Sequence, residues 1–195
     1  PGTFLSPEPG AAVVAGNTEV SQAVCNALLG ALGVMACSQG TMNNLLFGDA
    51  TRQYYETICG GMGAGPTWDG AGPVQTHMTN SRLTDPEVLE FRFPVRLESF
   101  ALREGSGGAG KWRGGEGGVR RVRFLEAMQA SILSNGRHHG AFGADGGQAG
   151  AVGINRVERA DGSVLELDHI ASVEMQPGDV FVIETPGGGG YGREG

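Results

Sequence analysis

The stretch from residue 75 to residue 87 contains the densest set of side chains able to bind a substrate or transfer protons. His77 is its candidate acid or base, because an imidazole exchanges its proton near neutral pH. Asp69 precedes the stretch and adds a carboxylate that could share this work. The other polar candidates of the stretch are Asn80, Arg82 and Asp85. A lone histidine is also a common structural residue, so the sequence leaves a site and a structural role for His77 both open.

Two glycine-rich segments, residues 58–66 and 185–192, could present backbone N–H groups to an anion. Glycine adopts the dihedral angles that make successive N–H groups converge in this way. The same composition suits a loop packed closely against its neighbours, and for residues 58–66 taken alone this interpretation is favoured. In the second segment, four consecutive glycines follow an apolar run. Ordering them costs backbone entropy, so we expect a close approach to a ligand or to another subunit.

The segment Gly105–Lys111 matches the first part of a phosphate-binding loop, G-x-x-x-x-G-K. Trp112 follows where Ser or Thr would hold Mg²⁺, and the segment leads into an expected strand rather than a helix. We therefore expect a glycine-rich connection between strands. The 4 histidines show no zinc-type spacing, which argues against a complete metal site within the chain.

The 3 cysteines, an odd number without a C-x-x-C pair, are typical of a protein kept in a reducing compartment. The N-terminus has no basic and apolar leader, and together these features predict a cytoplasmic location. No base stands beside the thiols in sequence, so a cysteine nucleophile is not expected. The chain begins with Pro1 instead of Met, and we expect it to be part of a longer reading frame.

The composition narrows the class of partner. The formal net charge is −7, from 14 basic and 21 acidic residues, and a nucleic-acid partner would require a concentrated basic face. No run of about 18 apolar residues is present to span a membrane. With 36 Gly and 9 Pro among 195 residues, turns and close backbone contacts should be frequent. A small-molecule substrate or a protein partner is therefore favoured.

The elements that must position these groups are one helix followed by short strands. A cap and an acidic first turn at residues 17–19, then apolar residues at helical spacing from Val20 to Met35, predict a helix that ends near Ala36 and packs against the core. Beyond it, alternating runs are typical of half-buried antiparallel strands. We expect the α+β class: a β-rich domain of mainly antiparallel strands with one long N-terminal helix and glycine-rich loops, in which residues 1–195 form a single region.

The strand-like runs are separated by glycines and tight turns. Asp161-Gly162, between Val157 and Val164, is typical of a β-hairpin turn. A second tight turn is expected at residues 176–179. The runs themselves are Tyr54–Cys59, Phe91–Phe93, Val95–Leu102, Val119–Leu125, Ala130–Leu133, Val173–Met175 and Val180–Glu184.

Stretches in order along nearly the whole chain carry a family resemblance. They are Gly16–Gln22, Ser38–Asn44, Tyr54–Thr57 with the glycine loop after it, His77–Asn80, Asp85–Glu90, Gly105–Gly118 and Thr185–Gly190. Together they resemble the hydantoinase B/5-oxoprolinase family, specifically the C-terminal part of its B-type subunit or domain. The resemblance covers the C-terminal third or so of a B-type chain.

The resemblance implies an activity shared between two modules. In that family an A-type subunit or fused domain binds ATP and phosphorylates a cyclic amide, and the B-type part completes ring opening of 5-oxoproline or an N-methylhydantoin. The chain would then be part of an ATP-dependent amidohydrolase, working in an oligomer with the A-type partner. A divalent metal, Mg²⁺ or Mn²⁺, would have its ligands outside this chain.

The resemblance also implies roles for the candidate residues. His77, Asp69 and Asp85 would be catalytic, and Asn80 and Arg82 would bind substrate. The backbone donors to a phosphoryl or carboxylate group would be Gly60, Gly61, Gly63, Gly187, Gly188 and Gly189. Two other functions stay open: a non-catalytic docking module whose glycines serve tight backbone packing, and a subunit of a related ATP-dependent ketone carboxylase.

Overall fold

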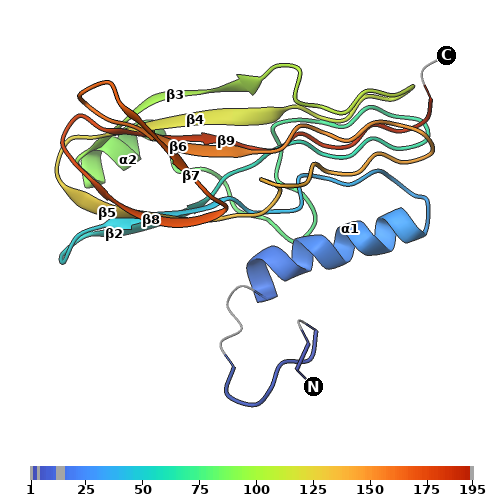
Figure 1. Ribbon diagram of the computed structural model, residues 1–195, viewed down its shortest axis with the longest axis horizontal. Helices are drawn as coiled ribbons and strands as arrows, with labels where there is room; N and C mark the ends of the chain where they lie inside the picture. The colour runs from blue at the N-terminus through green and yellow to red at the C-terminus, as the bar shows by residue number, and fades with distance from the viewer. Residues whose placement is uncertain (1, 4, 12–15, 194–195) are drawn as a thin grey trace.

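The computed structural model describes residues 2–3, 5–11 and 16–193, and within them two antiparallel sheets face each other (Figure 1). The first sheet has the strand order β2-β1-β5-β8, and the second has the order β3-β4-β9-β6-β7. The strands are β1 (Asn44–Gly48), β2 (Gln53–Thr57), β3 (Val95–Arg103), β4 (Gly117–Phe124), β5 (Met128–Leu133), β6 (Ile154–Glu158), β7 (Val164–Leu167), β8 (Ile170–Met175) and β9 (Val180–Glu184). The expected α+β class with mainly antiparallel strands is confirmed at this level.

The core lies between the two sheets, because alternate residues of each strand point inward. Leu45 and Ile132 come from the first sheet, and Val122 and Phe181 come from the second. The hairpin expected at Asp161-Gly162 is present, since β6 and β7 pair directly across it. Burial of these aliphatic and aromatic side chains is the main favourable term that holds the sheets together.

An ion pair is buried within this core. Arg120 on β4 donates through Nε and Nη2 to the two carboxylate oxygens of Glu56 on β2, at 2.7 and 3.0 Å. The arginines of β4 therefore do not all face solvent. Arg120 faces inward, while Arg121 and Arg123 lie on the half-exposed face of the strand. The bidentate geometry satisfies both charges, which a buried pair requires.

The N-terminal helix is shorter than expected. A π-helical turn, η1 (Gly16–Val20), leads into α1 (Ser21–Ala31), which has 11 residues and ends well before Ala36. Gly33, with φ at +65°, lies just beyond its end, where glycine is favoured. A second helix, α2 (Pro86–Arg92), replaces most of the strand expected at residues 91–93.

The helix α2 forms because its start carries strong local signals. Asp85 accepts a hydrogen bond from the Glu87 N–H at 2.9 Å, and Pro86 follows as the first helical residue. This cap determines the local structure more strongly than the short strand-like run at residues 91–93. The helix ends within that run. Leu89 is fully buried and anchors α2 to the core.

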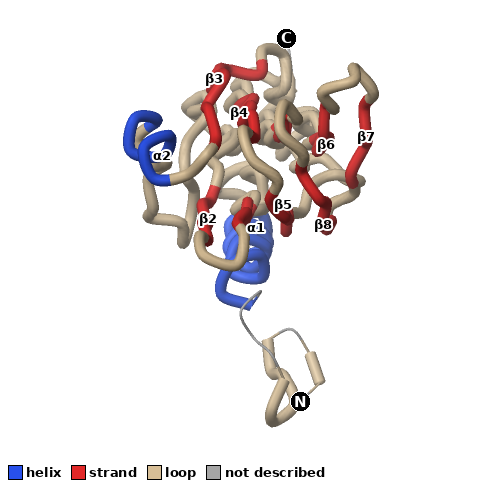
Figure 2. The backbone as a smooth tube through the Cα atoms, turned by 90° about the vertical axis from the view of Figure 1, so that its left-hand side faces the viewer, coloured by secondary structure: helices blue, strands red, loops and turns tan. Residues whose placement is uncertain are grey.

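The helix α1 has its apolar face outside, which corrects the expectation that it packs against the core. Its buried residues are Gln22 and Asn26. Val24, Leu28 and Leu32, spaced four residues apart, are 41%, 58% and 66% exposed. Viewed from one end, α1 lies outside both sheets, on the side of the first sheet (Figure 2). The helix predicted from the apolar spacing is present, but the face that it buries is the polar one.

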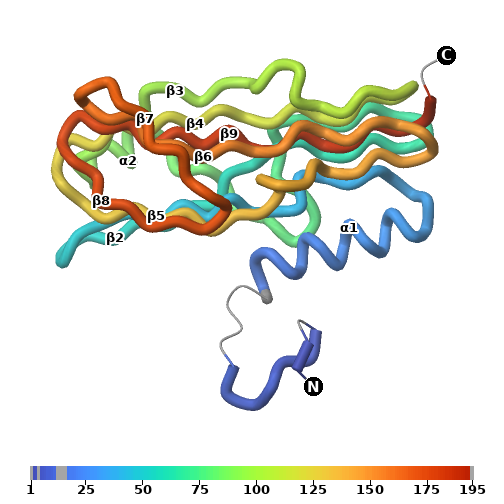
Figure 3. Tube along the Cα trace, viewed as in Figure 1, coloured from blue at the N-terminus to red at the C-terminus, as the bar shows by residue number. Residues whose placement is uncertain are grey.

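Beyond the strands, extended glycine-rich segments run side by side toward the end of the molecule that α1 flanks (Figure 3). Residues 187–190 bond several of these segments at once. The N–H groups of Gly187, Gly188, Gly189 and Gly190 donate to the carbonyls of Ala151, Gly115, Cys37 and Gln148 at 2.8–3.1 Å. Because these bonds go to three different segments, this glycine bundle (residues 36–40, 60–65, 70–72, 106–115, 141–151 and 186–192) is packed from several directions and is not a sheet.

Within the described residues, no helix is both long enough and apolar enough to cross a membrane.

Replacing Gly188 with alanine should destabilise the glycine bundle severely. The added Cβ would collide with the carbonyl group of Met62, which belongs to the backbone and cannot move aside cheaply. We expect the free energy of unfolding, measured by urea denaturation, to fall by about 3 kcal/mol or more. The control is Gly162→Ala, where φ is +87° and no atom lies within 4 Å of the new Cβ. It should cost only about 1 kcal/mol, from the left-handed backbone alone. Equal losses in both variants would contradict the packing role.

Candidate active site

His77 lies against the polar face of α1. Its backbone is in the left-handed region, with φ at +55°, and its ring is half-buried. The ring Nε2 lies 2.7 Å from the side-chain oxygen of Asn26. A non-glycine residue in this conformation is strained unless its surroundings hold it. The structure thus holds the imidazole in one orientation by a contact with the helix.

The contact with Asn26 fixes the ring tautomer. Asn26 Oδ1 also accepts the Ser38 N–H at 3.0 Å, while its Nδ2 donates to the Ser38 carbonyl at 3.4 Å. Since the oxygen of Asn26 is an acceptor only, Nε2 of His77 must donate to it. Nδ1 is then the basic nitrogen of the neutral ring. Burial lowers the pKa of His77, so this neutral form is favoured.

The loop that carries His77 is held by a second helix residue. Gln22 donates through Nε2 to the Thr76 carbonyl at 3.2 Å and to Thr79 Oγ1 at 2.9 Å. Thr76 Oγ1 donates in return to Gln22 Oε1 at 3.3 Å. Gln22 and Asn26 are one turn apart on α1. The same face of the helix therefore holds the loop on either side of His77 and the His77 ring itself.

The other predicted catalytic side chains have partners other than His77. Asp69 is exposed and accepts the Arg113 N–H at 2.6 Å. Asp85 is exposed and caps α2, a role that accounts for it without any catalytic work. Asn80 and Arg82 are also exposed. Of the predicted catalytic residues, His77 is thus the one that the described structure builds into a polar cluster.

The N–H groups of the predicted glycine donors are already used within the chain. Gly60 donates to the Val74 carbonyl at 3.4 Å, Gly61 to the Pro186 carbonyl at 2.9 Å, and Gly63 to Ser38 Oγ at 3.1 Å. The N–H groups of Gly187, Gly188 and Gly189 are paired as described above. None of these six groups is free in this structure to bind a substrate anion. A Cβ added at any of these six glycines would collide with a neighbouring group, so each position is closely packed.

The phosphate-loop-like segment also uses its N–H groups internally. It connects β3 with β4 and opens no helix. Glu116 Oε2 accepts the N–H of Ser106 at 2.6 Å, its hydroxyl at 2.9 Å and the N–H of Gly107 at 3.0 Å. Burial alone would raise the pKa of Glu116, but these hydrogen bonds outweigh it and lower that pKa. The carboxylate of Glu116 thus accepts from N–H groups that a phosphate loop would offer to its anion.

A buried polar cluster around Glu19 was missed by sequence reasoning. Glu19 Oε1 accepts from the Thr41 hydroxyl at 3.1 Å, the Met42 N–H at 3.0 Å and Asn44 Nδ2 at 2.8 Å. Its Oε2 accepts from Asn135 Nδ2 at 2.9 Å. The amide-rich stretch at residues 38–44 was the available signal, since amide side chains in number suit a buried hydrogen-bonded cluster.

Arg137 extends this cluster. Its Nη1 donates to Asn43 Oδ1 at 2.6 Å and to the Asn135 carbonyl at 2.7 Å, and its Nη2 donates to Asn155 Oδ1 at 2.7 Å. Burial lowers the pKa of Arg137 to about 9, an effect that the charge of Glu19 opposes. The guanidinium is therefore a cation held by neutral acceptors, with the buried Glu19 carboxylate nearby to balance its charge.

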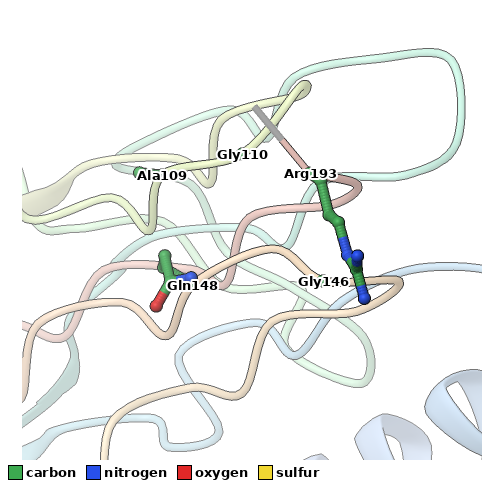
Figure 4. A pocket seen from close by; sticks show the side chains of 5 residues that line it. All are labelled: Ala109, Gly110, Gly146, Gln148 and Arg193. Atoms are coloured by element: carbon green, nitrogen blue, oxygen red, sulfur yellow. The ribbon is translucent and has the colours of Figure 1, made fainter. Parts of the chain in front are cut away.

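A surface hollow of about 310 Å³ lies near the end of the glycine bundle (Figure 4). Its lining residues are Ala109, Gly110, Gly146, Gln148 and Arg193. No predicted site residue is among them. The polar cluster at His77, and not this hollow, is therefore the better candidate for chemistry.

Comparison with known proteins identifies the family. The family model described as hydantoinase B/oxoprolinase matches residues 1–194. The chain is also 51% identical over 191 residues to 5-oxoprolinase 1 of Arabidopsis thaliana, an alignment that covers 98% of this chain. The chain therefore belongs to the hydantoinase B/oxoprolinase family. It spans only 15% of the length of that plant relative.

Two solved structures share the fold. A nucleotide-free acetone carboxylase, from a study of ATP-dependent acetone carboxylation, matches 82% of this chain and 27% of its own with a TM-score of 0.67 and 19% identity. An ATP-dependent caprolactamase from Pseudomonas jessenii matches 82% of this chain and 30% of its own with a TM-score of 0.65 and 25% identity. In both of these solved structures, the fold described above is therefore one part of a much longer chain.

The imidazole of His77 should titrate with a midpoint below about 6.5, its ordinary value. Burial disfavours the charged ring, and the folded chain therefore binds this proton less readily than the unfolded chain. Folding is consequently disfavoured by His77 as the pH falls below about 6.5. Nitrogen-15 NMR of the ring measures both the midpoint and the tautomer, which should carry its proton on Nε2. A midpoint above 6.5, or a proton on Nδ1, would contradict the assignment.

Changing Glu19 to glutamine should destabilise the chain by about 3 kcal/mol. The new amide group would turn donors toward Thr41, Asn44 or Asn135, which themselves donate to this carboxylate. Urea denaturation measures the loss. The matched control is Glu104→Gln at an exposed position, which should change the free energy of unfolding by less than about 0.5 kcal/mol. A Glu19 variant as stable as this control would show that the carboxylate charge is not needed.

Proposed function

We propose that this chain is the C-terminal part of the B-type module of an ATP-dependent enzyme that hydrolyses cyclic amides, with 5-oxoproline as the favoured substrate. The observation that carries the proposal is the 51% identity to 5-oxoprolinase 1 over nearly the entire chain. The fold shared with an ATP-dependent caprolactamase supports the same class of reaction, since a lactam is a cyclic amide.

The reaction needs an activated amide, because an unstrained amide is a poor electrophile. In the proposed reaction, phosphorylation of the amide oxygen by ATP supplies a good leaving group. One water molecule then attacks the ring carbon and the C–N bond opens, which leaves an acyl phosphate. A second water molecule hydrolyses this acyl phosphate and releases phosphate. Overall, one ATP, one cyclic amide and two water molecules give ADP, phosphate and the ring-opened amino acid. A base that takes the proton of the attacking water would accelerate ring opening.

His77 is the residue of this chain that we assign as that base. Its Nε2–H is held by Asn26, and its Nδ1 is left with a lone pair. Burial keeps the ring neutral and thus able to accept a proton. Asp69, Asn80 and Arg82 are exposed, and they would contact the substrate only if the remainder of the enzyme closes over them.

The proposal includes an A-type partner or fused domain that binds ATP. The internal pairing of the N–H groups of Ser106 and Gly107 with Glu116 supports placing the nucleotide outside this chain. We also assign the ligands of a divalent metal, Mg²⁺ or Mn²⁺, to the remainder of the enzyme. A cytoplasmic hetero-oligomer fits the three free thiols of Cys25, Cys37 and Cys59.

A docking module is the second candidate function. It is favoured by the exposed apolar side chains of Val24 and Leu28 on α1 and of Leu32 directly after it, since single-sided apolar helices are normally covered. The internal pairing of the glycine N–H groups fits the same interpretation. In that case the chain would position other subunits and supply no catalytic group.

The two functions predict different outcomes for His77→Asn in the complete enzyme. Asparagine tolerates the left-handed backbone at this position but cannot act as a base. We expect 5-oxoproline-dependent release of ADP, with kcat reduced by about a hundredfold or more in the variant. Size-exclusion chromatography should show that the complex still assembles.

The matched control is His139→Asn, because His139 is exposed on the surface. It should leave turnover unchanged. Full turnover by His77→Asn in an assembled complex would favour the docking module. Release of ADP that requires a ketone and bicarbonate, and not 5-oxoproline or a hydantoin, would instead identify the ketone carboxylase reaction.

A further inference from the structure

Three side chains without a role in the proposed reaction converge on one point of the surface. His138 lies in the loop after β5, and Asp168 and His169 form the turn between β7 and β8. His138 Nε2 lies 2.9 Å from Asp168 Oδ1, and His169 Nδ1 lies 2.7 Å from the same oxygen. One potential ligand atom from each of the three residues lies within 4.8 Å of those of the other two.

The convergence is fixed by buried residues beneath it. The N–H and the hydroxyl of Ser134 donate to the His169 carbonyl at 2.9 and 2.8 Å. Asn155 Nδ2 donates to the Asp168 carbonyl at 3.1 Å and to Ser134 Oγ at 3.2 Å. The segment that carries His138 and the turn that carries the other two groups are therefore tied together through their backbones. A site on such an anchored frame needs little reorganisation to bind an ion.

The guanidinium of the neighbouring arginine is bound to other residues, which leaves this point of the surface free for a cation. Arg137 precedes His138 in the chain, but its guanidinium donates to Asn43 Oδ1 and Asn155 Oδ1 in the cluster described above. Asp168 supplies a negative charge on the surface side, where solvent reaches His138 and Asp168.

The separations suit ligands of one metal ion. Two ligand atoms that each lie about 2.0–2.2 Å from a shared tetrahedral ion are about 3.4 Å apart. The nitrogen–oxygen separations of 2.7 and 2.9 Å would have to widen by about half an ångström to reach this value, which small rotations of these surface side chains allow. Each ring can move its proton to its other nitrogen and so bind the ion as a neutral imidazole. Two imidazoles and one carboxylate are a donor set typical of divalent transition metals.

We propose that His138, Asp168 and His169 form a binding site for a divalent transition-metal ion, with Zn²⁺ as the representative ion. Three protein ligands leave the remaining coordination positions to water, because the site is open to solvent. The inference rests on these three side chains and is independent of the proposed amide hydrolysis.

Isothermal titration of the metal-free chain with Zn²⁺ tests the site, with Co²⁺ absorption as a second measure of coordination. We expect one ion per chain. His138→Gln and His169→Gln should each weaken binding by about tenfold or more, since each removes one ligand. His139→Gln is the matched control: it changes the exposed neighbour of His138 and should leave the affinity unchanged.

Circular dichroism should show that the glutamine variants keep the fold, since these side chains lie at the surface. Mg²⁺, which prefers oxygen ligands, should bind far more weakly than Zn²⁺. Zn²⁺ affinity that is equal in His138→Gln, His169→Gln and His139→Gln would overturn the proposal. So would the absence of Zn²⁺ binding by the folded, metal-free chain.

Discussion

Backbone hydrogen bonding by residues 187–190 is the interaction on which the described structure depends. These glycines donate to three separate segments, and the carbonyls of Gly188, Gly189 and Gly190 accept from Gly108, Ala64 and Ala144. Side chains would prevent neighbours from approaching on several sides, and glycine removes that obstacle at a cost in backbone entropy. The bundle joins the segment after α1 to the loops that lead to the candidate site. The position of His77 therefore depends on it.

The helix α1 is held by polar contacts, in contrast to most surface helices of globular proteins. Glu19 in the preceding turn η1, and Gln22 and Asn26 in α1, are all buried, and each is hydrogen-bonded to loops beneath the helix. Burial of polar groups is tolerable here because the groups are paired. The same arrangement leaves the apolar residues of α1 facing outward, which fits a chain that spans 15% of the length of its plant relative.

The chemistry available to the chain follows from which polar groups are already paired. The backbone N–H groups that looked suited to anions donate to carbonyls, to Ser38 or to Glu116. Charged side chains such as Arg120 and Arg137 are held by partners within the chain. The imidazole of His77, with Nδ1 as its basic nitrogen, is the group that we propose for a hydrolytic reaction. In this proposal the candidate site is a side chain and not a glycine loop.

The sequence by itself determined the family, most strands and the hairpin turn at Asp161-Gly162, because alternation and turn preferences are local properties of the chain. It also singled out His77, although not its partner Asn26. Only the tertiary structure decided which face α1 buries and which N–H groups are paired, because both depend on segments distant in sequence. It likewise brought Glu19 to Asn135 and His138 to Asp168, contacts that span 116 and 30 positions of the chain. Local patterns cannot specify such meetings, since they are set by how the two sheets and the glycine bundle fold together.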